Sequence, residues 1–141
     1  MANYNATIRT NYFGVTDESK FREIIDSCSA EDEIHIFESN DGSRKFGFGC
    51  FGSIYGIPAT EDEDDDSEND LDAFYDSLQA VLVKGDAIII TENGYEKLRF
   101  LIACCTVITQ NDIQGIDLRN KAIDLARDML KNPDYITEMD Y

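Results

Sequence analysis

The sequence predicts an α+β fold, with one largely antiparallel five-stranded sheet and three helices in the order βαββαββα. Three observations predict this class. Short segments of alternating apolar residues, typical of strands, are interleaved with three longer segments in which apolar residues recur every three or four positions, typical of helices. Aspartate–glycine and asparagine–glycine pairs separate neighbouring strand segments, as in hairpins. The length, 141 residues, suits a single domain.

The chain is expected to begin with a strand and a helix. Tyr4–Phe13 alternates and is rich in threonine and aromatic residues, which favour strands, and Gly14 ends it. Thr16 is expected to cap the helix, because its hydroxyl can accept a bond from an amide of the first turn. The helix is expected to bury one stripe, which comprises Phe21, Ile24, Ile25 and Cys28.

A hairpin is expected next. Glu33–Glu38 alternates as a strand, and Asn40–Gly42 supplies the turn, because glycine adopts the positive φ of a tight hairpin. Lys45–Tyr55 is the expected return strand, with Phe46, Phe48 and Cys50 on one face and Gly47 and Gly49 on the other. Flat backbone at these glycines would let a helix or a partner approach closely.

Two further helices are predicted. Asn69 or Asp70 caps the first, and Asp117 caps the second, which ends at Asn132–Pro133. Their aligned apolar residues are Leu71, Phe74, Tyr75, Leu78, Val81 and Leu82 in the first helix, and Leu118, Ala122, Leu125, Ala126 and Met129 in the second.

A second hairpin is expected between these two helices. Ala87–Thr91 is typical of a strand buried on both faces, Asn93–Gly94 is the strongest turn signal, and Leu98–Thr109 is the return strand. A helix–hairpin unit thus occurs twice, with Gly42 corresponding to Gly94. This is either an internal repeat or the ordinary likeness of any two such units. Both alternatives predict a partly ferredoxin-like, split βαβ sheet with helices on one face.

The chain is strongly acidic, with a net charge of −17 and a pI of about 4.1. This balance argues against direct binding to nucleic acid or to anionic membranes, since both need cations on the protein. Residues 59–70 are expected to form an acidic insertion, and residues 134–141 an acidic tail. Four cysteines without a Cys-x-x-Cys pair, and no signal peptide after Met1, favour a reduced protein in the cytoplasm.

No catalytic, cofactor-binding or metal-binding residue is predicted, and the chain is not expected to be an enzyme. Residues 47–52 match G-x-G-x-x-G, but they lie in a strand and open no helix that could hold a pyrophosphate. In an EF-hand loop starting at Asp62, Ser67 would replace the glycine and Ala73 the glutamate. His35 has no ligand partner in its strand, and nothing nominates a base that would activate Ser53.

The acidic segment is the predicted binding site. Its carboxylates are Glu61, Asp62, Glu63, Asp64, Asp65, Asp66, Glu68, Asp70, Asp72 and Asp76. One interpretation is a solvated loop that keeps the protein soluble. The other is a surface that imitates DNA, since duplex DNA carries about one charge per 1.7 Å of axis and a helix rises about 1.5 Å per residue. Such a surface would bind the basic groove of a nucleic-acid-binding protein.

Three stretches of the chain are distinctive: residues 3–13, Phe46–Ile54 and Asn132–Tyr135. They resemble a group of small acidic proteins encoded on phages and conjugative elements of gut Firmicutes, and the resemblance covers most of the chain. It supplies no catalytic residues. It implies a mobile-element setting, in which acidic proteins of this size are often anti-restriction or anti-CRISPR inhibitors.

The expected function is therefore that of a non-enzymatic DNA mimic, an inhibitor of a host nucleic-acid-binding defence protein such as a CRISPR effector or a restriction enzyme. The alternative is a structural or regulatory protein–protein interaction module, a homodimer formed through an open strand edge or the glycine- and phenylalanine-rich surface of Lys45–Tyr55. Salt distinguishes the two, because electrostatic association weakens with ionic strength and apolar association does not.

Overall fold

The computed structural model describes residues 4–58, 69–97 and 100–137, which form three helices and nine strands. The strands are β1 (Asn5–Thr10), β2 (Ser29–Ala30), β3 (Ile34–Glu38), β4 (Phe46–Phe51), β5 (Ile54–Pro58), β6 (Asn69–Asp70), β7 (Ile88–Glu96), β8 (Phe100–Ile108) and β9 (Ile113–Asp117). The helices are α1 (Glu18–Ser27), α2 (Leu71–Val81) and α3 (Leu118–Leu130).

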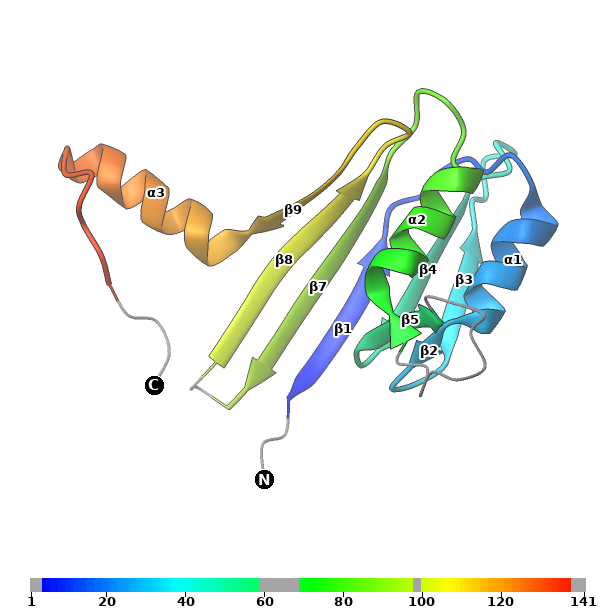
Figure 1. Ribbon diagram of the computed structural model, residues 1–141, viewed down its shortest axis with the longest axis horizontal. Coiled ribbons are helices and arrows are strands. Elements are labelled where there is room, and N and C mark those ends of the chain that lie inside the picture. The colour runs from blue at the N-terminus through cyan, green and yellow to red at the C-terminus, as the bar shows by residue number, and fades with distance from the viewer. Residues whose placement is uncertain (1–3, 59–68, 98–99, 138–141) are drawn as a thin grey trace.

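A six-stranded antiparallel sheet forms the centre of the molecule, in the order β3-β4-β1-β7-β8-β9, and β2, β5 and β6 form a small second sheet (Figure 1). The α+β class with three helices is confirmed, and the prediction of one five-stranded sheet is wrong. The sequence pattern missed β2 and β6 because two residues cannot show alternation, and it missed β9 because Gly115 interrupts it. β1–α1–β3 and β4–α2–β7 are both split βαβ units, with one strand between their two strands.

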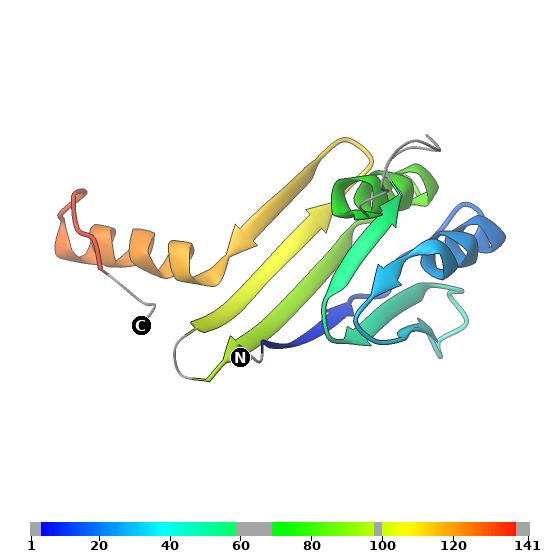
Figure 2. The ribbon, with the colours of Figure 1, turned by 60° about the horizontal axis from the view of Figure 1, so that its bottom comes forward.

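The core lies between this sheet and the helices α1 and α2, which pack side by side on one of its faces (Figures 1 and 2). The ring of Phe13 lies 5.6 Å from that of Phe21 and 6.3 Å from that of Phe48. The ring of Phe48 also lies 5.8 Å from that of Phe74, so aromatic contacts join α1, β4 and α2. The predicted stripes of these two helices are confirmed, because Phe21, Ile24, Ile25, Phe74, Leu78 and Val81 are buried.

Aspartates cap the three described helices. Asp17 caps α1 and accepts a first-turn amide at 3.1 Å, so the predicted Thr16 cap is wrong by one residue. The Thr16 amide instead donates to the carbonyl of Val81 at 2.7 Å, which ties the start of α1 to the end of α2. Asp70 caps α2, which decides between the two predicted alternatives, Asn69 and Asp70, and Asp117 caps α3 as predicted.

The predicted turn at Asn93–Gly94 is wrong. Both residues lie within β7, where Asn93 pairs with Thr7 of β1. A Cβ at Gly94 would overlap the phenol ring of Tyr4, so this position needs glycine for close packing and not for a positive φ. The strand ends at Glu96, and Gly42, which does have a φ of +79°, therefore has no structural counterpart at Gly94.

The predicted return strand Lys45–Tyr55 is divided in two. It breaks at Gly52, which has a φ of +116°, and the chain then leaves the central sheet as β5. β5 pairs with β2 and β6, and Gly56 (φ +106°) brings its backbone against the start of α2. The left-handed conformation at these two glycines is what redirects the chain.

α3 does not join the helical layer. It follows β9 directly and projects away from the sheet (Figures 1 and 2). The stripe of Leu118, Ala122, Leu125, Ala126 and Met129 lies on one side of the helix, but α3, which is described in full, has no buried residue. The expectation that α3 covers the same face of its own sheet as the other two helices is therefore wrong.

Candidate functional site

Three of the carboxylates predicted to bind a partner are described: Asp70, Asp72 and Asp76. The carboxylate of Asp70 accepts the amide of Asp72 at 2.8 Å, so it serves as the cap of α2. Asp72 and Asp76 are exposed and lie one turn apart on α2. The other seven, Glu61, Asp62, Glu63, Asp64, Asp65, Asp66 and Glu68, lie outside the described residues. Pro58 pairs with Asn69, so β5 and β6 hold the two ends of the acidic segment together.

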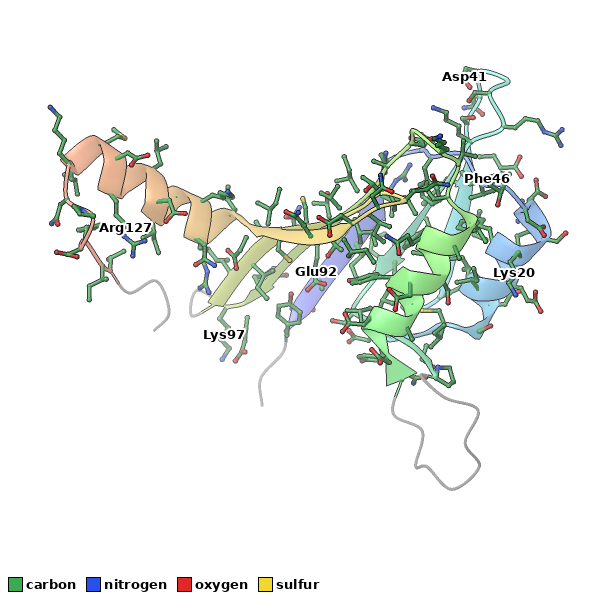
Figure 3. The ribbon with its side chains drawn as sticks, turned by 45° about the horizontal axis from the view of Figure 1, so that its top comes forward. Lys20, Asp41, Phe46, Glu92, Lys97 and Arg127 are labelled. Atoms are coloured by element: carbon green, nitrogen blue, oxygen red, sulfur yellow. The ribbon has the colours of Figure 1, made fainter. Side chains whose placement is uncertain are left out.

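A polar cluster occupies the part of the sheet beside α2, where Figure 3 labels Glu92. The Tyr4 hydroxyl donates to a Glu92 carboxylate oxygen at 2.7 Å. Burial and this hydrogen bond raise the pKa of Tyr4 well above its usual value. Burial and the neighbouring charges of Glu92 and Asp117 also raise the pKa of the Cys104 thiol. Both shifts favour the protonated form, so the cluster holds neither an activated nucleophile nor a base among these two groups.

The thiol of Cys28 is also held in its protonated form, because burial raises its pKa to about 11 from 9.0. We expect iodoacetamide at pH 8 to alkylate Cys28 about 100-fold more slowly in the folded protein than in guanidinium, since only the thiolate reacts. The rate should rise about tenfold per pH unit between pH 7.5 and 9.5. Mass spectrometry of the Cys28 peptide measures it; a plateau below pH 9 would contradict the assignment.

The described residues contain no group of three His, Cys, Asp or Glu side chains arranged to hold a metal ion. His35 is exposed on β3. Among the helices in the described ranges, none has the length and apolar character needed to cross a membrane.

The glycines of β4 are not the open docking surface that the sequence suggests. A Cβ at Gly49 would meet the ring of Phe37 at 3.2 Å and the side chain of Arg9 at 3.4 Å. The guanidinium of Arg9 lies 3.9 Å from the centre of the Phe37 ring, a cation–π contact. The chain's own side chains therefore cover the backbone at Gly49.

A different surface is apolar and uncovered. We call the face of the six-stranded sheet opposite α1 and α2 the open face. Ile88 and Ile90 point toward the helices and are buried, so Ile89 and Tyr95 of the same strand point to the open face, where Tyr95 is 52% exposed. Cα pairing in register places Leu101 opposite Tyr95, and Leu101 is 57% exposed.

β8 is the clearest sign that no described element fully covers this half of the sheet. Its sequence is an almost continuous apolar run, which is typical of a strand covered on both faces. Among its residues 101–108, only Ile108 is buried. At its free edge β9 adds Ile116, which is also exposed.

A concavity of about 980 Å³ lies where the open face meets the first turn of α3. Its apolar lining residues include Phe51, Tyr95, Leu101, Leu118 and Ala122. Because these residues come from both the sheet and α3, the concavity joins the exposed apolar side of α3 to that of the sheet, and together they form one candidate docking surface. In Figure 3 the labels of Lys97, at the end of β7, and Arg127, on α3, mark this side of the molecule, and Lys20 marks the α1–α2 layer.

Two signals for this surface were visible in the chain. The strand Leu98–Thr109 and the apolar stripe of the third helix were both predicted, but that helix was expected to cover one face of its own sheet. Burial depends on what covers a residue, which no pattern within one element can give. No protein-family model, no curated protein and no solved structure matches this chain.

Proposed function

We propose that this protein is a non-enzymatic interaction module, which binds another protein chain through α3 and the open face of β7, β8 and β9. The observation that supports this is the pair of uncovered apolar surfaces. Met129 is 75% exposed and Leu125 is 59% exposed on α3, and they face the same side of the helix as Leu118.

Isolated helices of about this length are marginal in water, and most helices gain stability by packing an apolar face. Large contiguous apolar patches on a soluble protein usually mark a docking site. The cluster around Glu92 gives less support for catalysis, because the raised pKa values of Tyr4 and Cys104 keep both groups uncharged and hence poor nucleophiles. Binding is thus a better account of this surface than catalysis.

A second candidate function is the acidic mimicry of DNA, directed at the basic groove of a host nucleic-acid-binding protein. Its support is the exposed pair Asp72 and Asp76 on α2, beside the acidic segment. The first-turn position of Asp72 favours a carboxylate by a few tenths of a kcal/mol, and the repulsion between the two like charges costs about the same, so the pair adds little net stability to the fold. The two candidates use different surfaces and can be tested separately.

The first candidate is tested by adding one charge to either side of α3. Met129→Glu places a carboxylate on the apolar side, and Asn120→Glu places one half a turn away on the polar side. Each protein is immobilised and incubated with its own soluble form and with an extract of the cells that encode it. We expect Met129→Glu to capture at least tenfold less protein than the native chain at both 0.1 and 0.5 M NaCl, because a carboxylate is costly to bury. Asn120→Glu should capture as much as the native chain. Equal binding by all three proteins would refute the module.

The second candidate is tested in the same assay with a neutralised protein. Asp72, Asp76 and the acidic residues of 61–68 become Asn or Gln, and Asp70 is kept because it caps α2. We expect this variant to lose basic, nucleic-acid-binding partners that the native protein holds at 0.1 M but releases at 0.5 M NaCl. If no partner shows that salt dependence, the mimicry proposal fails.

A further inference from the structure

Within the described residues, α3 touches β8 and β9 but buries none of its own residues. Asp117 is both the last residue of β9 and the cap of α3, so no linker separates the strand from the helix. The first turn borders the concavity through Leu118 and Ala122, and the helix then leads away from the sheet (Figure 1). Folding it back over the open face would require breaking the Asp117 cap or the end of β9.

The open face is the complementary half. It presents Ile89, Tyr95, Leu101 and Ile116 on three neighbouring strands, and no described helix covers them. One chain therefore carries an apolar helix without a sheet and an apolar sheet without a helix. A contact that satisfies only one of them leaves the other exposed.

We propose that the occupant of this surface is a second copy of the chain, with the α3 of each copy lying across the open face of the other. The inference rests on the proposed function and names its partner. Such an exchange is isologous, since each copy gives a helix and receives one, and it closes with two-fold symmetry. A single kind of contact, made twice, then covers both uncovered surfaces.

The exposed apolar side chains agree with this arrangement. On α3, Leu118, Leu125 and Met129 are 61%, 59% and 75% exposed, and on the sheet Tyr95 and Leu101 are 52% and 57% exposed. Each partner contributes roughly 800 Å² to a standard stable interface. Because every copy contributes a helix face and a sheet face, each face needs to supply only roughly 400 Å².

Charge also favours a second copy. Residues 118–131 hold four cations, Arg119, Lys121, Arg127 and Lys131, and only two carboxylates, in a chain whose net charge is −17. α3 is therefore a basic element on an acidic protein. The net negative charge of the other copy attracts this helix at long range, which partly offsets the repulsion between two chains of like net charge.

The mass in solution is the first test. Light scattering after gel filtration should give twice the chain mass of 15.9 kDa for the native protein and for Asn120→Glu, at 0.1 and 0.5 M NaCl. Met129→Glu should give the monomer mass at the same concentration, with the helical circular dichroism of a folded protein. A native monomer at all concentrations would overturn the inference while leaving binding to a different protein, and hence the proposed function, intact.

Two adjacent cysteines provide the second test, because they lie on opposite faces of β8. Cys105 pairs with Thr91, and its sulfur lies 3.4 Å from the Thr91 hydroxyl on the open face; Cys104 pairs with Glu92 on the other face. Met129→Cys is combined with Cys104→Ser in one protein and with Cys105→Ser in the other. Cys28 and Cys50 remain in both.

A short bismaleimide should link residue 129 of one copy to Cys105 of another, identified by mass spectrometry of the crosslinked peptide. The protein that retains Cys104 should give at most one tenth as much of the corresponding link. A dimer that crosslinks through Cys104 instead would overturn the open-face geometry. If Met129→Glu changes neither the dimer nor any captured protein, α3 is not a binding element and the proposed function falls as well.

Discussion

Phe48→Ala is expected to lower the free energy of unfolding by about 3–5 kcal/mol, as large-to-small changes at fully buried aromatic residues do. Phe48 is 0% exposed, and its ring contacts those of Phe13 and Phe74. It lies on β4, between Phe13 in the connection from β1 to α1 and Phe74 in α2, so the cavity would open where these three parts of the core meet. Urea unfolding followed by circular dichroism measures the change.

The matched control is Phe51→Ala in the same strand. Phe51 is 70% exposed on the open face, so its loss should change the unfolding free energy by less than about 0.5 kcal/mol at micromolar or lower concentrations. If the protein dimerises through this face, the difference between Phe51→Ala and the native protein should grow with concentration, because association stabilises the folded state. Similar losses for Phe48 and Phe51 would contradict the assignment of the core to the helical side.

Local signals in the chain were enough to predict the helices. Their apolar stripes have helical spacing, and aspartate is a strong cap because its side chain bonds free amides of the first turn. The cap at Asp117 was therefore located correctly from the sequence alone, and the cap of α2 was narrowed to Asn69 or Asp70, of which the structure has Asp70. The one-residue error at Thr16 arose because Asp17 competes for the same role, and the tertiary bond from Thr16 to Val81 decides between them.

What the sequence could not give depends on contacts between distant residues. Asn93–Gly94 has the composition of a hairpin turn, but the glycine is there to admit the ring of Tyr4, 90 positions away in sequence. In the same way, a stripe such as that of α3 shows that a helix has an apolar side. It does not show whether that side meets its own sheet or another chain.

The arrangement of the acidic segment could be predicted only in part, for a related reason. Composition locates the carboxylates, but their arrangement depends on how the ends of the segment are held. β5 and β6 pair at Pro58 and Asn69, and the cap at Asp70 then starts α2. The residue that permits this junction is Gly56, which no charge pattern would single out.

Gly56→Ala is accordingly expected to destabilise the protein by roughly 3–5 kcal/mol. Gly56 has a φ of +106°, and a Cβ there would overlap the backbone of Asp70 and Leu71. The start of α2 would have to move, since neither obstacle is a flexible side chain. Gly85→Ala is the matched control, because Gly85 has a φ of +86° with no atom within 4 Å of the added Cβ; it should cost only about 1–2 kcal/mol.

The two substitutions thus separate backbone strain from steric overlap, and urea unfolding of both measures the difference. Amide hydrogen exchange adds a local readout. The Asp70 carboxylate accepts the amides of Asp72 and Ala73, so Gly56→Ala should speed exchange at these two amides more than Gly85→Ala does. Equal effects of the two substitutions on stability and on exchange would mean that the backbone between β5 and α2 adjusts to a Cβ at Gly56 at little cost. Gly56 would then not hold the carboxylates of α2 in place. A selective effect would identify β5 as the support on which the acidic end of this helix depends.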